Sequence, residues 1–173
     1  MFGELNSNDL ELDAIYLGVL TARRVKPLSR LEYPVMPWII GAIKRMGLIV
    51  EPVNRFAQNG ALVNHWIVGR DRRLIDQYRS DFDGKLLEEN TTQVAKLEAR
   101  YFGYPVCCAE AYVKSPHTPN DLTLKDQQLL FHYACPGCKE TPKLIPLYQL
   151  ALDEAEMLYK KLQGNNCLEG LLV

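Results

Sequence analysis

Apolar and polar positions repeat along most of the chain with a period of about 3.6 residues, which is typical of helices packed on one side. The first such stripe runs through Leu10, Ile15 and Leu20 and predicts a helix over residues 8–24, ended by Lys26-Pro27. Similar stripes, with a capping residue or a proline near their starts, predict five further helices: residues 36–46, 72–80, 91–101, 105–115 and 141–163. Residues 122–134 read as a helix that passes into an extended segment.

Two shorter apolar runs predict strands instead. They are "LIVEPV", residues 48–53, and "ALVNHWIVGR", residues 61–70, and a turn at Asn59-Gly60 can join them into a hairpin. The fold class predicted is α+β, mostly helical, with a small antiparallel sheet or hairpin. We expect a single domain over residues 1–173, with an N-terminal helical and hairpin part to about residue 85 and a cysteine-bearing helical part from about residue 86.

Composition narrows the class of protein. With 47% hydrophobic residues in 173, the chain can bury a core of its own. The net charge of −1 disfavours a protein whose main role is to coat nucleic acid, although it leaves room for a local basic patch. No apolar run reaches a membrane span, and the polar "MFGELNSNDLELD" start is unlike a signal peptide. We therefore expect a cytoplasmic protein with no membrane partner, and leave a homo-oligomer open.

Four of the five cysteines fall into two tight pairs. Cys107 and Cys108 are adjacent in "GYPVCCAEAY", and Cys135 and Cys138 form a C-x-x-C in "FHYACPGC". Cytoplasmic cysteines are normally reduced thiols, so paired ones are more often metal ligands or redox groups than structural disulfides. Cys167, alone near the C-terminus, reads as a simple thiol.

The first hypothesis is a metal site, most simply zinc, which needs four ligands in a structural centre. Adjacent cysteines diverge by about 100° on a helix, so the favoured set is Cys135, Cys138, one of the vicinal pair and His132, which lies three residues before the C-x-x-C. A four-cysteine set is the alternative. An iron–sulfur cluster is less favoured, because the spacing does not match the ferredoxin runs. Were one coordination position open to water, Glu110 would be the candidate general base.

Two other interpretations of the cysteines stay open. In a thiol–disulfide redox protein, Cys107 or Cys108 at a helix start would attack, and Cys135 or Cys138 would resolve the mixed disulfide. Alternatively, the cysteines only pack as small apolar side chains. Of the remaining histidines, His65 reads as a structural group in a strand, and His117, in a loop between prolines, fits either role.

Basic residues concentrate in two stretches. "GRDRR" covers residues 69–73, and "ARRVKPLSR" covers residues 22–30. Such clusters can contact phosphates, but a solvated face is the favoured interpretation in a chain of nearly neutral charge. The third hypothesis is therefore a nucleic-acid or protein interaction module in which the cysteines are structural.

The segments "RYFGYPVCCAEAY" and "FHYACPGC" together resemble an uncharacterised, mainly archaeal family, catalogued as a domain of unknown function. Its members carry a Gly-Tyr-Pro-x-Cys-Cys motif and a downstream His-x-x-Cys-x-x-Cys-like motif. The resemblance covers about the second half of the chain. It brings no established activity, but it implies that one family site includes Gly103, Tyr104, Pro105, Cys107, Cys108, His132, Cys135 and Cys138.

Overall fold

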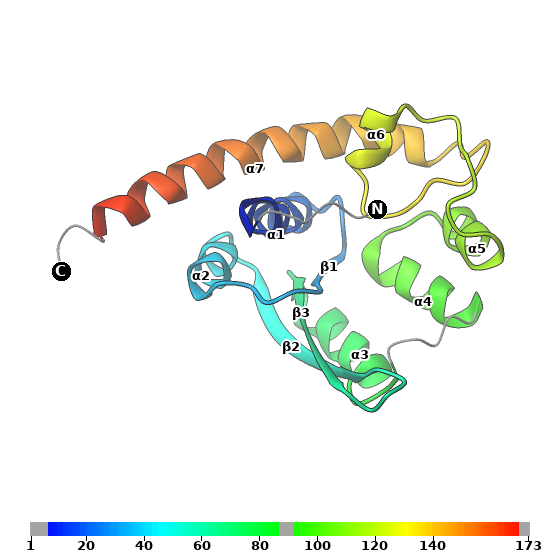
Figure 1. Cartoon of the computed structure of the whole chain (residues 1–173), viewed down its shortest axis with the longest axis horizontal. Helices are drawn as coiled ribbons and strands as arrows, with labels where there is room; N and C mark the ends of the chain where they lie inside the picture. The colour runs from blue at the N-terminus through cyan, green and yellow to red at the C-terminus, as the bar shows by residue number, and fades with distance from the viewer. Residues whose placement is uncertain (1–6, 87–91, 170–173) are drawn as a thin grey trace.

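The computed structural model of the chain describes residues 7–86 and 92–169, with side chains described over residues 10–86 and 92–164. Helices dominate and surround a three-stranded antiparallel sheet (Figure 1), which confirms the predicted fold class. In chain order the elements are α1 (Ser7–Ala22), β1 (Leu28–Leu31), α2 (Pro37–Arg45), β2 (Ile49–Phe56), β3 (Leu62–Gly69), α3 (Arg72–Phe82), α4 (Thr92–Phe102), α5 (Val106–Lys114), α6 (Leu124–Gln128) and α7 (Thr141–Glu169).

The sheet has the order β1-β3-β2. The predicted hairpin is present: β2 and β3 pair from Phe56↔Leu62 at the turn to Ile49↔Gly69 at the open end. Strand β1 joins the other side of β3, with Leu28 opposite Gly69. Strand β1 was not predicted, because its four residues are too few to show a period of two.

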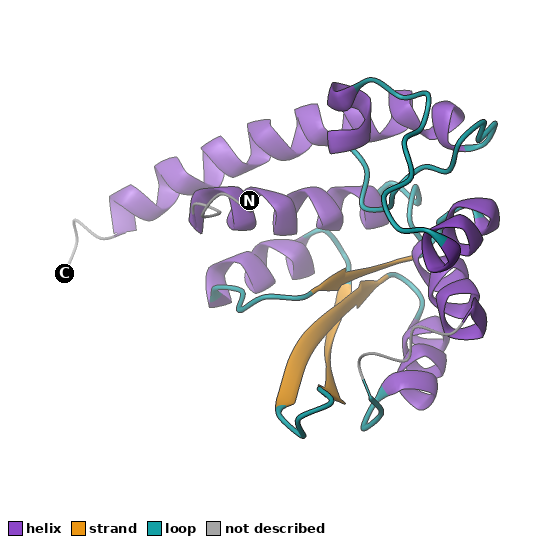
Figure 2. Ribbon diagram, turned by 45° about the vertical axis from the view of Figure 1, so that its right-hand side comes forward, coloured by secondary structure: helices purple, strands orange, loops and turns teal. Residues whose placement is uncertain are grey.

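The two faces of the sheet carry two apolar cores, as alternation along a strand requires. Val50 and Val68 face the larger core, which α1, α2 and α7 complete. Val53 and Ile67 face the opposite side, where α3 and α4 contribute the smaller, aromatic-rich core. Figure 2 shows the sheet between these two groups of helices.

Three predicted helix ends differ from the structure by two residues or more, and the simplest case is α3, which runs to Phe82 and not to residue 80. Helix α1 stops at Ala22, two residues early, because Arg24 adopts the left-handed conformation with φ +62°. The N–H of Val25 then donates to the carbonyl of Leu20 at 2.9 Å, which closes the helix end. Helix α7 continues to Glu169, so Gly164 does not end it as predicted. A glycine inside a helix costs only about 1 kcal/mol, and a 29-residue helix can absorb it.

The outer edge of β2 is covered by the segment that follows α3. Asn54 donates its backbone N–H to Asp83 and accepts from the N–H of Gly84, and Phe56 donates to the carbonyl of Lys85. Pro52 lies two residues before Asn54, at a position whose N–H would also point outward, but proline has no N–H.

No helix within the described residues has the length and apolarity needed to cross a bilayer.

Candidate metal centre

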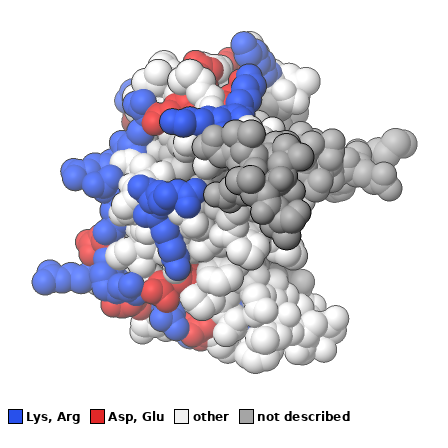
Figure 3. All heavy atoms as spheres, turned by 90° about the vertical axis from the view of Figure 1, so that its left-hand side faces the viewer, with Lys and Arg blue, Asp and Glu red and all other residues white. Residues whose placement is uncertain are grey.

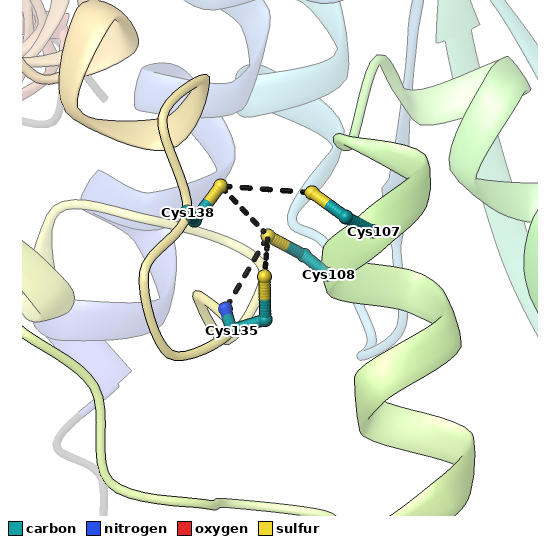
Figure 4. A group of neighbouring side chains, drawn as sticks. All are labelled: Cys107, Cys108, Cys135 and Cys138. Atoms are coloured by element: carbon teal, nitrogen blue, oxygen red, sulfur yellow. Dashed lines mark hydrogen bonds between the residues drawn. The ribbon is translucent and has the colours of Figure 1, made fainter.

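The two cysteine pairs, 27 residues apart at their closest, meet in space. Cys107 and Cys108 lie in the first turn of α5, and Cys135 and Cys138 lie on the loop that leads into α7 (Figure 4). Their four sulfur atoms all lie within 4.8 Å of one another. The four cysteines are free thiols, with Cys108 buried and Cys107 exposed.

The separations of the sulfurs match the edges of a small tetrahedron. Cys108 Sγ lies 3.5 Å from Cys138 Sγ and 3.8 Å from Cys135 Sγ, and Cys107 Sγ lies 3.7 Å from Cys138 Sγ. Four sulfurs about 2.3 Å from a central ion would be about 3.8 Å apart, whereas disulfide sulfurs lie about 2.05 Å apart. The sulfurs are thus spaced for a shared metal ion.

Both vicinal cysteines reach the group, contrary to the preference for one of them. The side chains diverge along the helix, yet the C-x-x-C loop passes across the start of α5 and meets both (Figure 4). This start is fixed by Gly103, whose φ of +69° turns the chain sharply after α4, and by Pro105, the N-cap of α5. A side chain at Gly103 would not fit, because its Cβ would lie 2.8 Å from Pro27 Cδ.

The C-x-x-C itself forms a tight turn. The N–H of Cys138 donates to the carbonyl of Cys135 at 3.2 Å, and Gly137 supplies the left-handed residue that the turn requires, with φ +66°. Asp121 accepts a hydrogen bond from the N–H of Gly137 at 3.0 Å. The turn therefore points both sulfurs inward and holds them in place.

Two helix N-termini converge on the sulfurs. Cys107 and Cys108 occupy the first turn of α5, and the N–H of Thr141, at the start of α7, donates to Cys138 Sγ at 3.3 Å. Neither helix carries an acidic residue in its first turn. Helix N-termini carry unpaired N–H groups and a partial positive charge, so both favour an anionic group of thiolates.

The thiols differ in acidity. Burial opposes ionisation of Cys138, but hydrogen bonds from the hydroxyl and backbone N–H of Thr141 outweigh it and lower the pKa of that thiol to about 7. Burial and the contact with Cys138 raise the pKa of Cys107 to about 11, and burial, with its contacts to the vicinal pair, raises the pKa of Cys135 further. In the absence of a cation, Cys138 is thus the first of these three thiols to ionise.

His132 lies beside the group and does not belong to it. Its Nε2 is 3.1 Å from Thr141 Oγ1, and this hydroxyl lies 3.4 Å from Cys108 Sγ and 3.3 Å from Cys138 Sγ. Burial, and then the nearby Lys26, lower the pKa of His132 to about 4, so the ring is neutral. The structure thus groups four cysteine sulfurs, and His132, expected as a ligand, is connected to them through Thr141.

Three residues that the sequence analysis missed hold the loop from outside. Thr141 begins α7, and its side chain contacts the sulfurs. Gln127 accepts from the N–H of Ala134 and donates to the carbonyl of His132, and Asn120 donates to the carbonyl of Ala134. Side chains of this kind orient metal ligands. Sequence alone gives no signal for them, because isolated Asn, Gln and Thr residues are common.

The remaining predicted residues lie outside the cysteine group. The carboxylate of Glu110 pairs with Lys96 at 2.5 Å, and this cation lowers its pKa, which disfavours a role as general base. His117 stands between the rings of Tyr112 and Tyr133, and His65 is buried in β3. The side chain of Cys167 falls outside the described residues.

A cavity of about 530 Å³ adjoins the site, with Cys108 and His132 in its wall. Tyr104 and Phe131 supply apolar surface, and Arg30 provides a cation that already pairs with a carboxylate, Glu98, at 2.7 Å.

Comparisons with protein-family models, with curated proteins and with solved structures found no match. The family resemblance noted in the sequence stays a prediction, and the function has to be inferred from the site.

Proposed function

We propose that Cys107, Cys108, Cys135 and Cys138 bind one zinc ion and that this ion is structural. The observation that supports it most directly is the spacing of the four sulfurs, all within 4.8 Å, with three separations between 3.5 and 3.8 Å. Four protein ligands fill a tetrahedral zinc site, which leaves no position for water or substrate. The site therefore favours a stabilising role over hydrolytic chemistry.

Zinc is favoured over other metals by the ligands and the space between them. Four thiolates in a tetrahedral arrangement suit zinc or a single iron. A cluster of several irons with bridging sulfides would hold its cysteines farther apart than one shared ion does. The N–H donors of Cys135, to Cys108 Sγ, and of Thr141, to Cys138 Sγ, offset part of the negative charge of four thiolates.

The ion would join two parts of the chain that have little other reason to stay together. It would tie the start of α5 to the loop before α7 and so enclose the segment from residue 109 to residue 134, which contains the short helix α6. This segment contributes only Leu129 and Ala134 to the buried apolar side chains described for the chain. A segment with so small a core needs an additional source of stability, which a metal supplies because it binds the folded site and not the unfolded chain.

Elemental analysis of protein purified anaerobically without a histidine tag tests the proposal. We expect about one zinc per chain and thiols that react slowly until a chelator is added. Cys108→Ser and Cys138→Ser should each lose the zinc and unfold at lower temperature. Cys167→Ser is the matched control and should keep both the zinc and the stability.

The main competing function is thiol–disulfide exchange, which the exposure of Cys107 and the lowered pKa of Cys138 favour. It predicts metal-free protein in which Cys107 and Cys138 oxidise to a disulfide with the fold retained. Finding this, or finding that Cys138→Ser keeps a full zinc content, would rule out the structural zinc site.

A further inference from the structure

The open end of the sheet gathers basic side chains from three separate parts of the chain. The first residues of β1 and β2 and the last residue of β3 lie in one row, since Leu28 and Ile49 both pair with Gly69. The three connections that meet there, residues 22–27, 44–48 and 69–73, hold eight Lys and Arg residues and one acidic residue, Asp71. Because the whole chain has a net charge of −1, this excess of positive charge is local to the open end of the sheet.

The two basic stretches of the sequence thus share one surface, which the solvated-face interpretation did not foresee. Arg70 donates to the carbonyl of Ala22 at 2.9 Å, which ties the third connection to the first. Arg24, Arg70 and Arg72 line the same shallow hollow of about 740 Å³. Figure 3 shows that Lys and Arg side chains form a band along one side of the face it draws, with fewer acidic side chains among them.

Several of these cations are available to a ligand. Arg24, Arg70 and Arg73 are exposed and have no carboxylate partner within the described part of the chain. Arg72 pairs with the half-buried Glu51 and Arg23 with the partly exposed Glu154, but both guanidinium groups are exposed and can exchange a carboxylate for a phosphate. Lys26 is buried and contributes nothing to the surface.

The backbone conformation of Arg24 is a second observation that points to a function for this surface. It occupies the left-handed position after α1, where glycine is the usual residue and other side chains cost about 1 kcal/mol. Its guanidinium makes no hydrogen bond or ion pair within the described residues that would offset this cost. Strain of this kind in a native structure often marks a residue retained for function.

We infer that this surface, formed by Arg24, Arg70 and Arg72 with the exposed Arg73 next to them in the chain, binds the phosphate backbone of a nucleic-acid duplex. Arginine is the preferred side chain for contacting phosphate oxygens, because its planar fork can donate two hydrogen bonds at once. The described residues of the three connections include no aromatic side chain on which an unpaired base could stack, as single-strand binders require. They also include no large exposed apolar side chain of the kind that inserts into lipid.

Fluorescence anisotropy with a labelled duplex of about 20 base pairs, over about 50 to 200 mM salt, tests this inference. We expect micromolar binding at the lowest salt, falling steeply as salt rises, with a slope that reflects about three or four phosphate contacts. The same DNA as a single strand, and vesicles rich in phosphatidylserine, should bind at least about tenfold more weakly. No duplex binding at low salt, or equal or tighter binding of the single strand or the vesicles, would overturn it.

Arg24→Gly separates binding from folding. It should weaken duplex binding about threefold or more and make the salt slope shallower by about 0.9, while the thermal midpoint stays the same or rises. Arg73→Gln should weaken binding similarly, and the double variant more than either. Lys125→Gln removes an exposed charge on α6 and is the matched control, expected to bind as the original chain does. If Arg24→Gly and Arg73→Gln bind like Lys125→Gln, the surface is not the site. The zinc content should not change in any of these variants, so this inference and the zinc proposal fail independently.

Discussion

The link between the cysteine-bearing helix and the sheet depends on Gly103, and its replacement by alanine gives a quantitative prediction. Two costs add at this position. A non-glycine residue at φ +69° costs about 1 to 2 kcal/mol. The new Cβ would also lie 2.8 Å from Cδ of Pro27, a rigid ring that cannot rotate away, and such overpacking costs about 1 to 3 kcal/mol. We therefore expect Gly103→Ala to lower the free energy of unfolding by about 2 to 5 kcal/mol, measured by urea denaturation of the zinc-loaded protein.

Gly84→Ala is the matched control. Gly84 has a similar φ of +72°, but a Cβ built on it would meet no atom within 4 Å. It should show only the backbone cost of about 1 to 2 kcal/mol. Equal losses in the two variants would refute the contact with Pro27 as a source of stability. A Gly103→Ala chain as stable as the original would refute the tight junction altogether.

Three other perturbations test the buried polar groups. Glu98 accepts hydrogen bonds from both Arg30 and Arg55, and Arg55 is only 2% exposed. Glu98→Gln should therefore lower the free energy of unfolding, measured by urea denaturation, by about 3 to 5 kcal/mol. A loss below about 1 kcal/mol, as for an exposed ion pair, would contradict this prediction. Burial lowers the pKa of Lys26 well below its usual value, so between that lowered pKa and the usual one the unfolded chain binds more protons than the folded chain. The free energy of unfolding should then rise as the pH is raised from neutral toward the ordinary lysine pKa of about 10.4, by at most about 1.4 kcal/mol per unit, and Lys26→Met should flatten this rise. Tyr16 donates a hydrogen bond from its hydroxyl to the buried carbonyl of Leu129 at 2.9 Å. Tyr16→Phe removes this donor and should lower the free energy of unfolding by about 1 to 3 kcal/mol. An unchanged free energy of unfolding would show that water replaces the lost hydrogen bond.

Much of the fold follows from local signals. The turn at Asn59-Gly60 and the flanking apolar runs predict the β2–β3 hairpin, and Asp71 caps α3 as its position suggests, since it accepts from the N–H of Arg73. Strand β1 has no such signal, because it forms only when β3 presents a free edge to it. The end of α7 depends on packing along a long helix, which outweighs the preference of one glycine.

The candidate site, like the fold, could be predicted from the sequence only in part. The spacing within Cys107-Cys108 and within Cys135-x-x-Cys138 identifies which residues matter. Which ligand completes the set depends on how the loop crosses the start of α5, and this is a property of the tertiary fold. An angle taken from an ideal helix disfavoured the four-cysteine set, because it did not allow for a loop that approaches both vicinal cysteines.

The covered edge of β2 bears on how the protein behaves in a crowded cell. An unprotected sheet edge can recruit a strand from another chain and start aggregation. Here the outward N–H groups of Asn54 and Phe56 are already bound, and Pro52 has none. The opposite edge, β1, offers only four residues. A second copy that extended the sheet would find few free partners at either edge, so any self-association of this protein should involve its helices and leave the sheet at three strands.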